Sequence, residues 1–186
     1  MNQITPNFDR KIRAMKSIIA VLGAFLLLIG TTCFGQEKTK KQLREERKIE
    51  QEKQTQALID AKAFVFVGRM AYPTGYRSVD LTTNSNYVKF SPDHIESYMP
   101  FFGKAYSGIG YSGDQGLKFE GKPGIFTISK GKKNYLVEAE VKGPNDLYRL
   151  SLSVYYDGSA SLSITSNNRG FISYSGDISA QEKAKE

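Results

Sequence analysis

The sequence has very few of the side chains that most often carry chemistry. Its 186 residues include one cysteine, one histidine and no tryptophan. The cysteine, Cys33, ends an apolar segment near the N-terminus, so the rest of the chain can form no disulfide and offers a metal no thiolate. Structural zinc sites usually need four Cys or His ligands, and His94 is the only imidazole available to a nucleophile. We therefore predict no catalytic residues, no metal site and no cofactor.

A large excess of charge of one sign is also missing once the N-terminus is set aside. The formal net charge is +7, but four of the basic residues precede the apolar segment. Without residues 1–35 the chain has 22 basic and 18 acidic residues, a balance typical of an ordinary protein surface. The composition therefore argues against a nucleic-acid partner.

Long hydrophobic runs are absent as well. Residues 18–29 read IIAVLGAFLLLI behind a basic stretch, and these twelve residues fall short of the roughly 20 that a transmembrane helix needs. We predict that residues 1–35 are a signal peptide and that the protein is exported to the periplasm or cell envelope. Met15 would be a more usual start than Met1, and both starts remain open.

Two processing routes compete at the end of this segment. Cleavage after Gly35 would release a soluble protein that begins at Gln36, because Cys33 and Gly35 are small residues before the cut. Lipidation of Cys33 would instead give an outer-membrane lipoprotein, and it is the one predicted link to a membrane. The preceding residues 30–32, Gly-Thr-Thr, fit lipidation poorly. We therefore predict soluble release, with an uncleaved anchor as a third route.

A charged segment, residues 36–61, follows the predicted signal peptide. It has seven basic and six acidic residues and no Gly, Pro or aromatic residue, a composition that favours helix. Its apolar residues do not recur at the heptad spacing that a coiled coil needs. We therefore predict a solvated helical arm whose last turn docks on the domain that follows.

From Lys62 the periodicity of the apolar residues changes from helical to alternating. The Asp157-Gly158 pair between two alternating segments predicts a type I′ hairpin turn. The predicted strands are 64–70, 78–82, 87–90, 94–98, 117–120, 125–129, 135–141, 148–156, 160–164 and 171–174. This pattern predicts an all-β domain over residues 62–178, an antiparallel meander that forms a small sandwich or barrel, followed by a polar tail over 179–186.

Several stretches resemble an exported bacterial family described as domain of unknown function 4251. The matching stretches are YMPFFGKAY at 98–106, GLKF at 116–119, GSA at 158–160, TSNNR at 165–169 and ISYSG at 172–176. The likeness covers about residues 62–178 and includes the charged arm. The resemblance implies a β fold and a place in the envelope of a Gram-negative bacterium. It implies no activity, because no catalytic residues are assigned to the family.

The segment 98–124 is the least strand-like part of the domain. Glycines recur there among aromatic residues, which suits a binding loop and equally a loop that plugs one end of a barrel. The polar turn 167–169 is the second candidate, although Asn also favours a plain turn. The predicted recognition surface comprises Tyr98, Phe101, Phe102, Tyr106, Tyr111, Asn167, Asn168 and Arg169.

Two weaker candidates for chemistry remain. His94, between Asp93 and Glu96, would be a weak metal or acid–base site. Asp114 and Glu120 would be a carboxylate pair of the kind that hydrolyses glycosides, but the sequence leaves their separation open. The sequence therefore favours a non-catalytic domain that binds an envelope protein or a small ligand. The alternatives are a hydrolase that acts on envelope material and a structural component of an outer-membrane assembly.

Overall fold

The computed structural model describes residues 39–104, 116–144 and 146–181. The predicted signal peptide, Tyr106 and Tyr111 lie outside these residues. Residues from Leu43 onward form one compact unit. The described elements in chain order are helix α2 (Lys40–Ala61) and strands β1 (Phe64–Pro73), β2 (Val79–Asp80), β3 (Tyr87–Phe90), β4 (Ile95–Met99), β5 (Leu117–Gly121), β6 (Pro123–Lys130), β7 (Asn134–Lys142), β8 (Leu147–Tyr155), β9 (Ser159–Ser166) and β10 (Ile172–Ala180).

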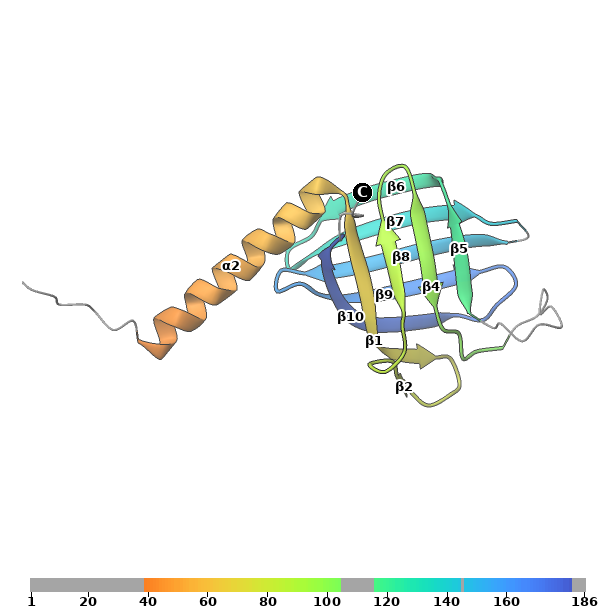
Figure 1. The fold of residues 1–186 in the computed structure, drawn as a ribbon, viewed down its shortest axis with the longest axis horizontal. Coiled ribbons are helices and arrows are strands. Elements are labelled where there is room, and N and C mark those ends of the chain that lie inside the picture. The colour runs from red at the N-terminus through yellow and green to blue at the C-terminus, as the bar shows by residue number, and fades with distance from the viewer. Residues whose placement is uncertain (1–38, 105–115, 145, 182–186) are drawn as a thin grey trace, which may run out of the picture. The chain divides into compact units, whose positions relative to one another are not determined.

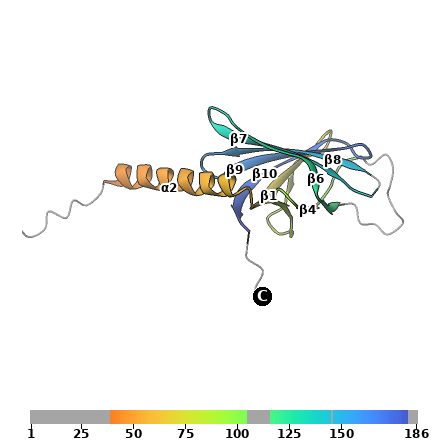
Figure 2. The same ribbon diagram turned by 90° about the horizontal axis from the view of Figure 1, so that it is seen from above.

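The strands form one antiparallel sheet that curls into a nearly closed barrel (Figure 1). Their order is β5-β4-β3-β1-β10-β9-β8-β7-β6, and the short β2 pairs with β1 outside this order. The sheet folds into two layers, one of β1, β3, β4 and β5 and the other of β6 to β10. The strands of the two layers cross steeply in Figure 1, and Figure 2 shows the layers edge-on. The predicted all-β antiparallel meander in a small barrel is confirmed.

The barrel closes at a bend between the two end strands of the sheet. β5 and β6 are consecutive in the chain, and only Lys122 separates them. β5 pairs with β4, whereas β6 pairs with β7, so one extended segment passes from one layer to the other. In the described part of the chain, each of these two strands has a strand neighbour on one side only.

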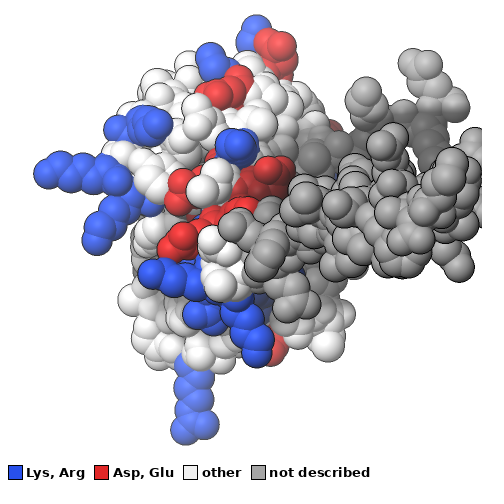
Figure 3. Space-filling model, turned by 90° about the vertical axis from the view of Figure 1, so that its left-hand side faces the viewer, with Lys and Arg blue, Asp and Glu red and all other residues white. Residues whose placement is uncertain are grey.

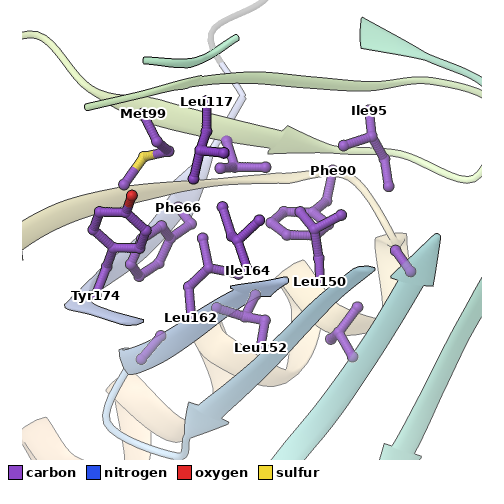
Figure 4. Close-up of a cluster of buried hydrophobic side chains, with 14 of the residues drawn as sticks. Phe66, Phe90, Ile95, Met99, Leu117, Leu150, Leu152, Leu162, Ile164 and Tyr174 are labelled. Atoms are coloured by element: carbon purple, nitrogen blue, oxygen red, sulfur yellow. The ribbon is translucent and has the colours of Figure 1, made fainter. Parts of the chain in front are cut away.

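The inward faces of the two layers form the core (Figure 4). Ten of its members, each at most 2% exposed, are Phe66, Phe90, Ile95, Met99, Leu117, Leu150, Leu152, Leu162, Ile164 and Tyr174. Each fully buried Leu, Ile or Phe side chain stabilises the fold by about 1.5–3 kcal/mol. Because these side chains fill the space between the layers, the centre of the barrel is a packed core.

Strand β1 bends where it passes between the layers. Its pairing with β10 shifts register between Gly68 and Met70, which leaves Arg69 as the extra residue of a β-bulge. The buried Asn86 supports the bulge: its Oδ1 accepts the N–H of Gly68 at 2.7 Å, and its Nδ2 donates to the carbonyl oxygen of Gly68 at 3.1 Å. An amide side chain thus bonds the backbone of Gly68 in the gap between the pairing of β1 with β3, which ends at Phe66, and its pairing with β2, which starts at Met70.

Helix α2 lies where the composition of the arm favoured helix. Its N-terminus has a capping box: Thr39 Oγ1 accepts the N–H of Gln42, and Gln42 Oε1 accepts the N–H of Thr39 at 2.9 Å. Near its other end, Ile59 is 3% exposed and belongs to the core. Within the described residues, no helix has the length and hydrophobicity needed to cross a membrane.

Two local predictions are wrong. The strand predicted at 171–174 runs on to Ala180, because β10 pairs along β1 as far as Phe64. The turn at Asp157 is not type I′, since Lys62 is the only described non-glycine residue with a positive φ. Instead Gly158, at a φ of 86°, donates its N–H to Tyr155. The hydroxyl of Ser159 donates to the Asp157 carboxylate, and this bond lowers the pKa of Asp157.

Candidate functional site

A groove of about 450 Å³ opens on the surface where β4 ends. Its polar lining consists of Thr83, Asn84 and Ser85 from the β2–β3 loop, Tyr98 of β4 and Lys118 of β5. Its other lining residues are Met99, Pro100, Phe101 and Gly116. We call this feature the Tyr98 groove. Its lining combines hydroxyl, amide and ammonium groups with one apolar wall.

Tyr98 is held in place from both neighbouring strands. It lies opposite Tyr87 in β3 and opposite Lys118 in β5. The rings of Tyr98 and Tyr87 stack at a centroid distance of 5.9 Å, and Lys118 Nζ lies 4.5 Å from the centroid of the Tyr98 ring. Such cross-strand and cation–π contacts restrict the ring, so a 40% exposed aromatic side chain is presented in a fixed orientation.

A hydrogen-bonded cluster lies on the same outer face beside Tyr98. Lys89 Nζ donates to Glu96 Oε2 at 2.8 Å, and the hydroxyl of Tyr87 donates to Glu96 Oε1. The bond from Lys89, and then the bond from Tyr87, lower the pKa of Glu96. The bond to Glu96 in turn raises the pKa of Lys89 and of Tyr87. The negative charge of Glu96 is therefore compensated within the cluster, one row away from the groove.

Arg169 connects the β9–β10 loop to the wall of the groove. Its Nη1 donates to the carbonyl oxygen of Gly116 at 2.7 Å, and its guanidinium carbon lies 5.3 Å from the centroid of the Phe101 ring. The next residue, Gly170, donates its N–H to the carbonyl oxygen of Lys104 at 2.9 Å. The loop after β4 and the turn after β9 therefore lie at the same end of the barrel.

The other residues of the predicted surface have different environments. Phe101 is only 7% exposed and belongs to the wall of the groove, whereas Phe102 is partly buried against the core and is not among the lining residues. Asn167 is exposed, and its N–H donates to Asp146 Oδ1 at 2.9 Å. The N–H of Asn168 donates to Ser166 Oγ at 3.1 Å. Tyr106 and Tyr111 lie outside the described residues.

Two features of this region were not predicted from the sequence. Asp146 accepts the N–H groups of Leu147 and Asn167 and the hydroxyl of Ser166, and so holds the 167–169 turn against the β7–β8 loop. This bonding depends on the register of the β8–β9 hairpin, which no local pattern predicts. The contribution of residues 83–85 to the lining of the Tyr98 groove was also not predicted, although the polar run TTNSN at 82–86 could have indicated a polar surface loop.

A family model for a domain of unknown function, DUF4251, matches residues 46–178. The chain belongs to the DUF4251 family. The resemblance noted in the sequence is thus confirmed, and the matched region includes most of helix α2. A crystal structure of a DUF4251 family protein from Bacteroides eggerthii DSM 20697 is similar at 18% identity and a TM-score of 0.55. The likeness covers 70% of this chain and 88% of that one and shows a shared fold. No curated protein matches.

The described imidazole and the described carboxylates of this DUF4251 domain lie outside the groove lining. No Asp, Glu, His or Cys is among the described residues that line the Tyr98 groove. His94 Nε2 and Glu120 Oε2 are 3.9 Å apart, on side chains that are 53% and 74% exposed. Asp114, the other half of the predicted carboxylate pair, lies outside the described residues. The described residues include no group of three or more His, Cys, Asp or Glu side chains placed to hold a metal ion.

Charges of both signs are mixed on the face of the DUF4251 protein that Figure 3 shows. Asp and Glu side chains gather near the middle of the view, and Lys and Arg side chains lie around them. A second groove, of about 360 Å³, lies on the outer face of the β6–β9 layer, where Ile125 and Phe171 are 51% and 45% exposed. Arg149 and Glu140, which also line it, form an ion pair at 3.1 Å.

Proposed function

We propose that this DUF4251 protein is an exported, non-catalytic binding domain of the cell envelope, and that its ligand occupies the Tyr98 groove. The observation that carries the proposal is the rigid, exposed Tyr98 ring between Tyr87 and Lys118 at the edge of the groove. An aromatic side chain that is already held in place loses little conformational entropy on binding, which favours affinity.

The polar lining indicates the chemistry of the ligand. The groove offers the ammonium of Lys118, the amide of Asn84 and the hydroxyls of Thr83, Ser85 and Tyr98. All of these groups can donate hydrogen bonds, and none is an anion. A ligand rich in hydrogen-bond acceptors with a negative charge, such as an acidic saccharide, therefore suits the groove better than a cation or a purely apolar molecule.

The same groove lining favours a binding role over the hydrolase alternative. General acid–base catalysis most often uses His, Asp or Glu within hydrogen-bond reach of the substrate. The described groove residues lack all three. The His94–Glu120 pair is exposed and does not belong to the groove lining. The described contacts supply no specific support for the assembly role of the helical arm.

The proposed location rests on the N-terminal sequence, in which residues 18–29 are apolar behind a basic stretch. The intact mass of the protein recovered from the periplasm tests it together with the processing route. A mass that begins at Gln36 supports soluble release. A mass that begins at Cys33 with added acyl chains would replace soluble release by a lipoprotein, and recovery only from the cytoplasm would contradict export.

Ligand binding is tested by titrating the exported protein with acidic and neutral oligosaccharides of matched length, followed by calorimetry or ligand-observed NMR. We expect the acidic oligosaccharides to bind more tightly, and their affinity to fall as salt is added. Lys118→Gln removes the ammonium, and Tyr98→Ala removes the ring, so each substitution should weaken binding at least tenfold. The matched control is Lys132→Gln in the exposed β6–β7 turn.

The three variants separate the outcomes. Equal loss of affinity in Lys132→Gln and Lys118→Gln would mean that general positive charge, not the groove, attracts the ligand. Unchanged affinity in Tyr98→Ala and Lys118→Gln would refute the site. Failure of every acidic oligosaccharide to bind would refute the proposed ligand class.

A further inference from the structure

Among the described strands, β6 is the last of the sheet and has a strand neighbour along one edge only. Its only strand partner in the described chain is β7, and the order of strands stops there. The face of the strand is open as well, because a Cβ atom added to Gly124 would meet no atom within 4 Å and Ile125 is 51% exposed. An open row of backbone N–H and C=O groups is a template on which another extended chain can add as a strand.

The inward side chains of β6 are also incompletely covered. Phe126 and Ile128 lie opposite Ala139 and Val137, which are buried in the core. Phe126 and Ile128 are only partly buried, although they point to the same side of the sheet. An added strand beside β6 would cover both side chains, so apolar burial as well as backbone hydrogen bonding would favour its addition.

The charges along the edge indicate which partner fits. Residues 122–133, KPGIFTISKGKK, contain four lysines and no acidic residue. Lys122 and Lys130 stand at the two ends of the strand, and both are exposed. Their separation of eight residues corresponds to about 27 Å of extended chain. Opposite charges on neighbouring strands attract, so acidic residues at both ends of an incoming strand would be favoured.

A second copy of this chain fits the same edge poorly. Antiparallel pairing of two β6 strands would bring Lys122 of one copy beside Lys130 and its neighbours in the other. Parallel pairing in register would place each lysine opposite its counterpart. Like charges directly opposite each other are destabilising, and lysines on an edge strand are a common protection against self-association.

We propose that the free edge of β6 is a docking site for an extended acidic peptide, which adds to the sheet beside β6. The core of that peptide is about seven residues long and alternates apolar and polar side chains, so that one face covers Phe126 and Ile128. Asp or Glu residues flank this core and lie near Lys122 and Lys130. The site is separate from the Tyr98 groove, and each can exist without the other.

Fluorescence anisotropy with three labelled peptides tests the docking site on the exported protein. The first peptide alternates valine and threonine over seven residues, with two glutamates at each end. The second has lysines in place of the glutamates. The third has the first sequence, but the amides of all seven core residues are N-methylated, so it keeps the charge while losing the N–H groups along both edges. We expect the first to bind at least tenfold more tightly than either of the others.

Charge reversal on the protein supplies the matched comparison. Lys122→Glu with Lys130→Glu should reverse the preference, so that the lysine-flanked peptide binds more tightly than the glutamate-flanked one. Arg77→Glu with Lys104→Glu changes the net charge equally at exposed positions outside β6, and should leave the preference unchanged. Circular dichroism of each variant confirms that the β fold is retained.

Several results would overturn the proposal. Equal affinity for the first and third peptides would show that backbone pairing is not used. Equal affinity for the first and second, or no affinity for the first, would remove the acidic partner. Dimerisation of the free protein that the first peptide disrupts would assign the edge to a second copy instead.

Discussion

Arg169 Nη1 donates a hydrogen bond of 2.7 Å to the carbonyl oxygen of Gly116, and the two residues are 53 positions apart in the chain. Gly116 precedes β5, and Arg169 lies in the loop before β10, so the bond ties the two layers together at one end of the barrel. The guanidinium also lies over the Phe101 ring at 5.3 Å. A half-buried arginine with these contacts is a structural link as well as a candidate for recognition.

Arg169→Ala should therefore lower the free energy of unfolding by about 1.5–3 kcal/mol, the range for hydrogen bonds to charged groups. Arg169→Lys keeps the charge but loses the planar donor geometry, so it should cost less than the alanine change. Urea unfolding measures both. The control is Arg149→Ala, whose exposed pair with Glu140 is worth at most about 1 kcal/mol. An equal cost for Arg169→Ala and Arg149→Ala would contradict the structural link.

Gly176 allows the close approach of β10 to the bulge in β1. A Cβ atom at Gly176 would lie 1.9 Å from the carbonyl oxygen of Val67, a backbone atom that cannot move without disturbing the strand. Gly176→Ala should therefore cost about 3 kcal/mol or more, at the upper end of the range for overpacking. The thermal midpoint of the purified variant measures this. Gly124→Ala, in open space on β6, should shift the midpoint little, and similar midpoints for the two variants would refute the steric argument.

The pKa of Glu96 is lowered chiefly by its bond from Lys89, which makes stability depend on pH. The carboxylate stabilises the fold above its unfolded pKa of about 4.3, and this contribution is lost as the pH falls through the lower folded pKa. At pH 7, Glu96→Gln should cost up to about 1 kcal/mol, because the pair is largely solvated. At an acidic pH, where the Glu96 carboxylate of the wild type becomes protonated, the cost of Glu96→Gln should be smaller than at pH 7.

Urea unfolding at the two pH values measures the difference. Lys89→Met removes the main cause of the lowered pKa, so it should reduce the pH dependence by a similar amount. Adding Glu96→Gln to Lys89→Met should then remove only the smaller remaining part of the pH dependence, which the bond from Tyr87 contributes. Additive effects of the two changes would show that Glu96 gains its charge stabilisation elsewhere.

The strands that pair with their neighbours in sequence were predictable, because alternation and short turns are local signals. Residues 135–141 alternate clearly, and β7 spans Asn134–Lys142. The pairing of β1 with β10 was not predictable, since Phe64 and Ala180 meet only after the whole sheet curls. The bulge at Arg69 and the bonds of Asn86 to Gly68 were not predictable either, because no spacing rule indicates them.

The candidate site was predictable only in part for a related reason. Tyr98 was recognisable as the aromatic residue that begins a segment rich in Gly and aromatic residues, and it lines the groove from the end of β4. Phe101 belongs to the same stretch, yet it is 7% exposed, because its ring lies beneath Arg169 from a distant loop. Burial of an aromatic side chain depends on what the fold brings over it, and composition alone does not contain that information.

Lys62 directly follows helix α2 and adopts a backbone conformation that suits glycine better than lysine. Its φ is 55°, in the left-handed region, and its N–H donates to the carbonyl oxygen of Ile59 at 3.0 Å. For residues with a Cβ atom this conformation costs roughly 1–2 kcal/mol, whereas glycine adopts it readily. Because glycine also loses more entropy on folding, Lys62→Gly should give a net stabilisation of about 1 kcal/mol and raise the thermal midpoint by roughly 3 °C.

Lys62→Ala keeps the Cβ atom and should change the midpoint little. Ala63→Gly places glycine one residue later, where φ is not positive, and should lower it. A stabilisation by Ala63→Gly as large as that by Lys62→Gly would show that the gain does not come from the left-handed helix end.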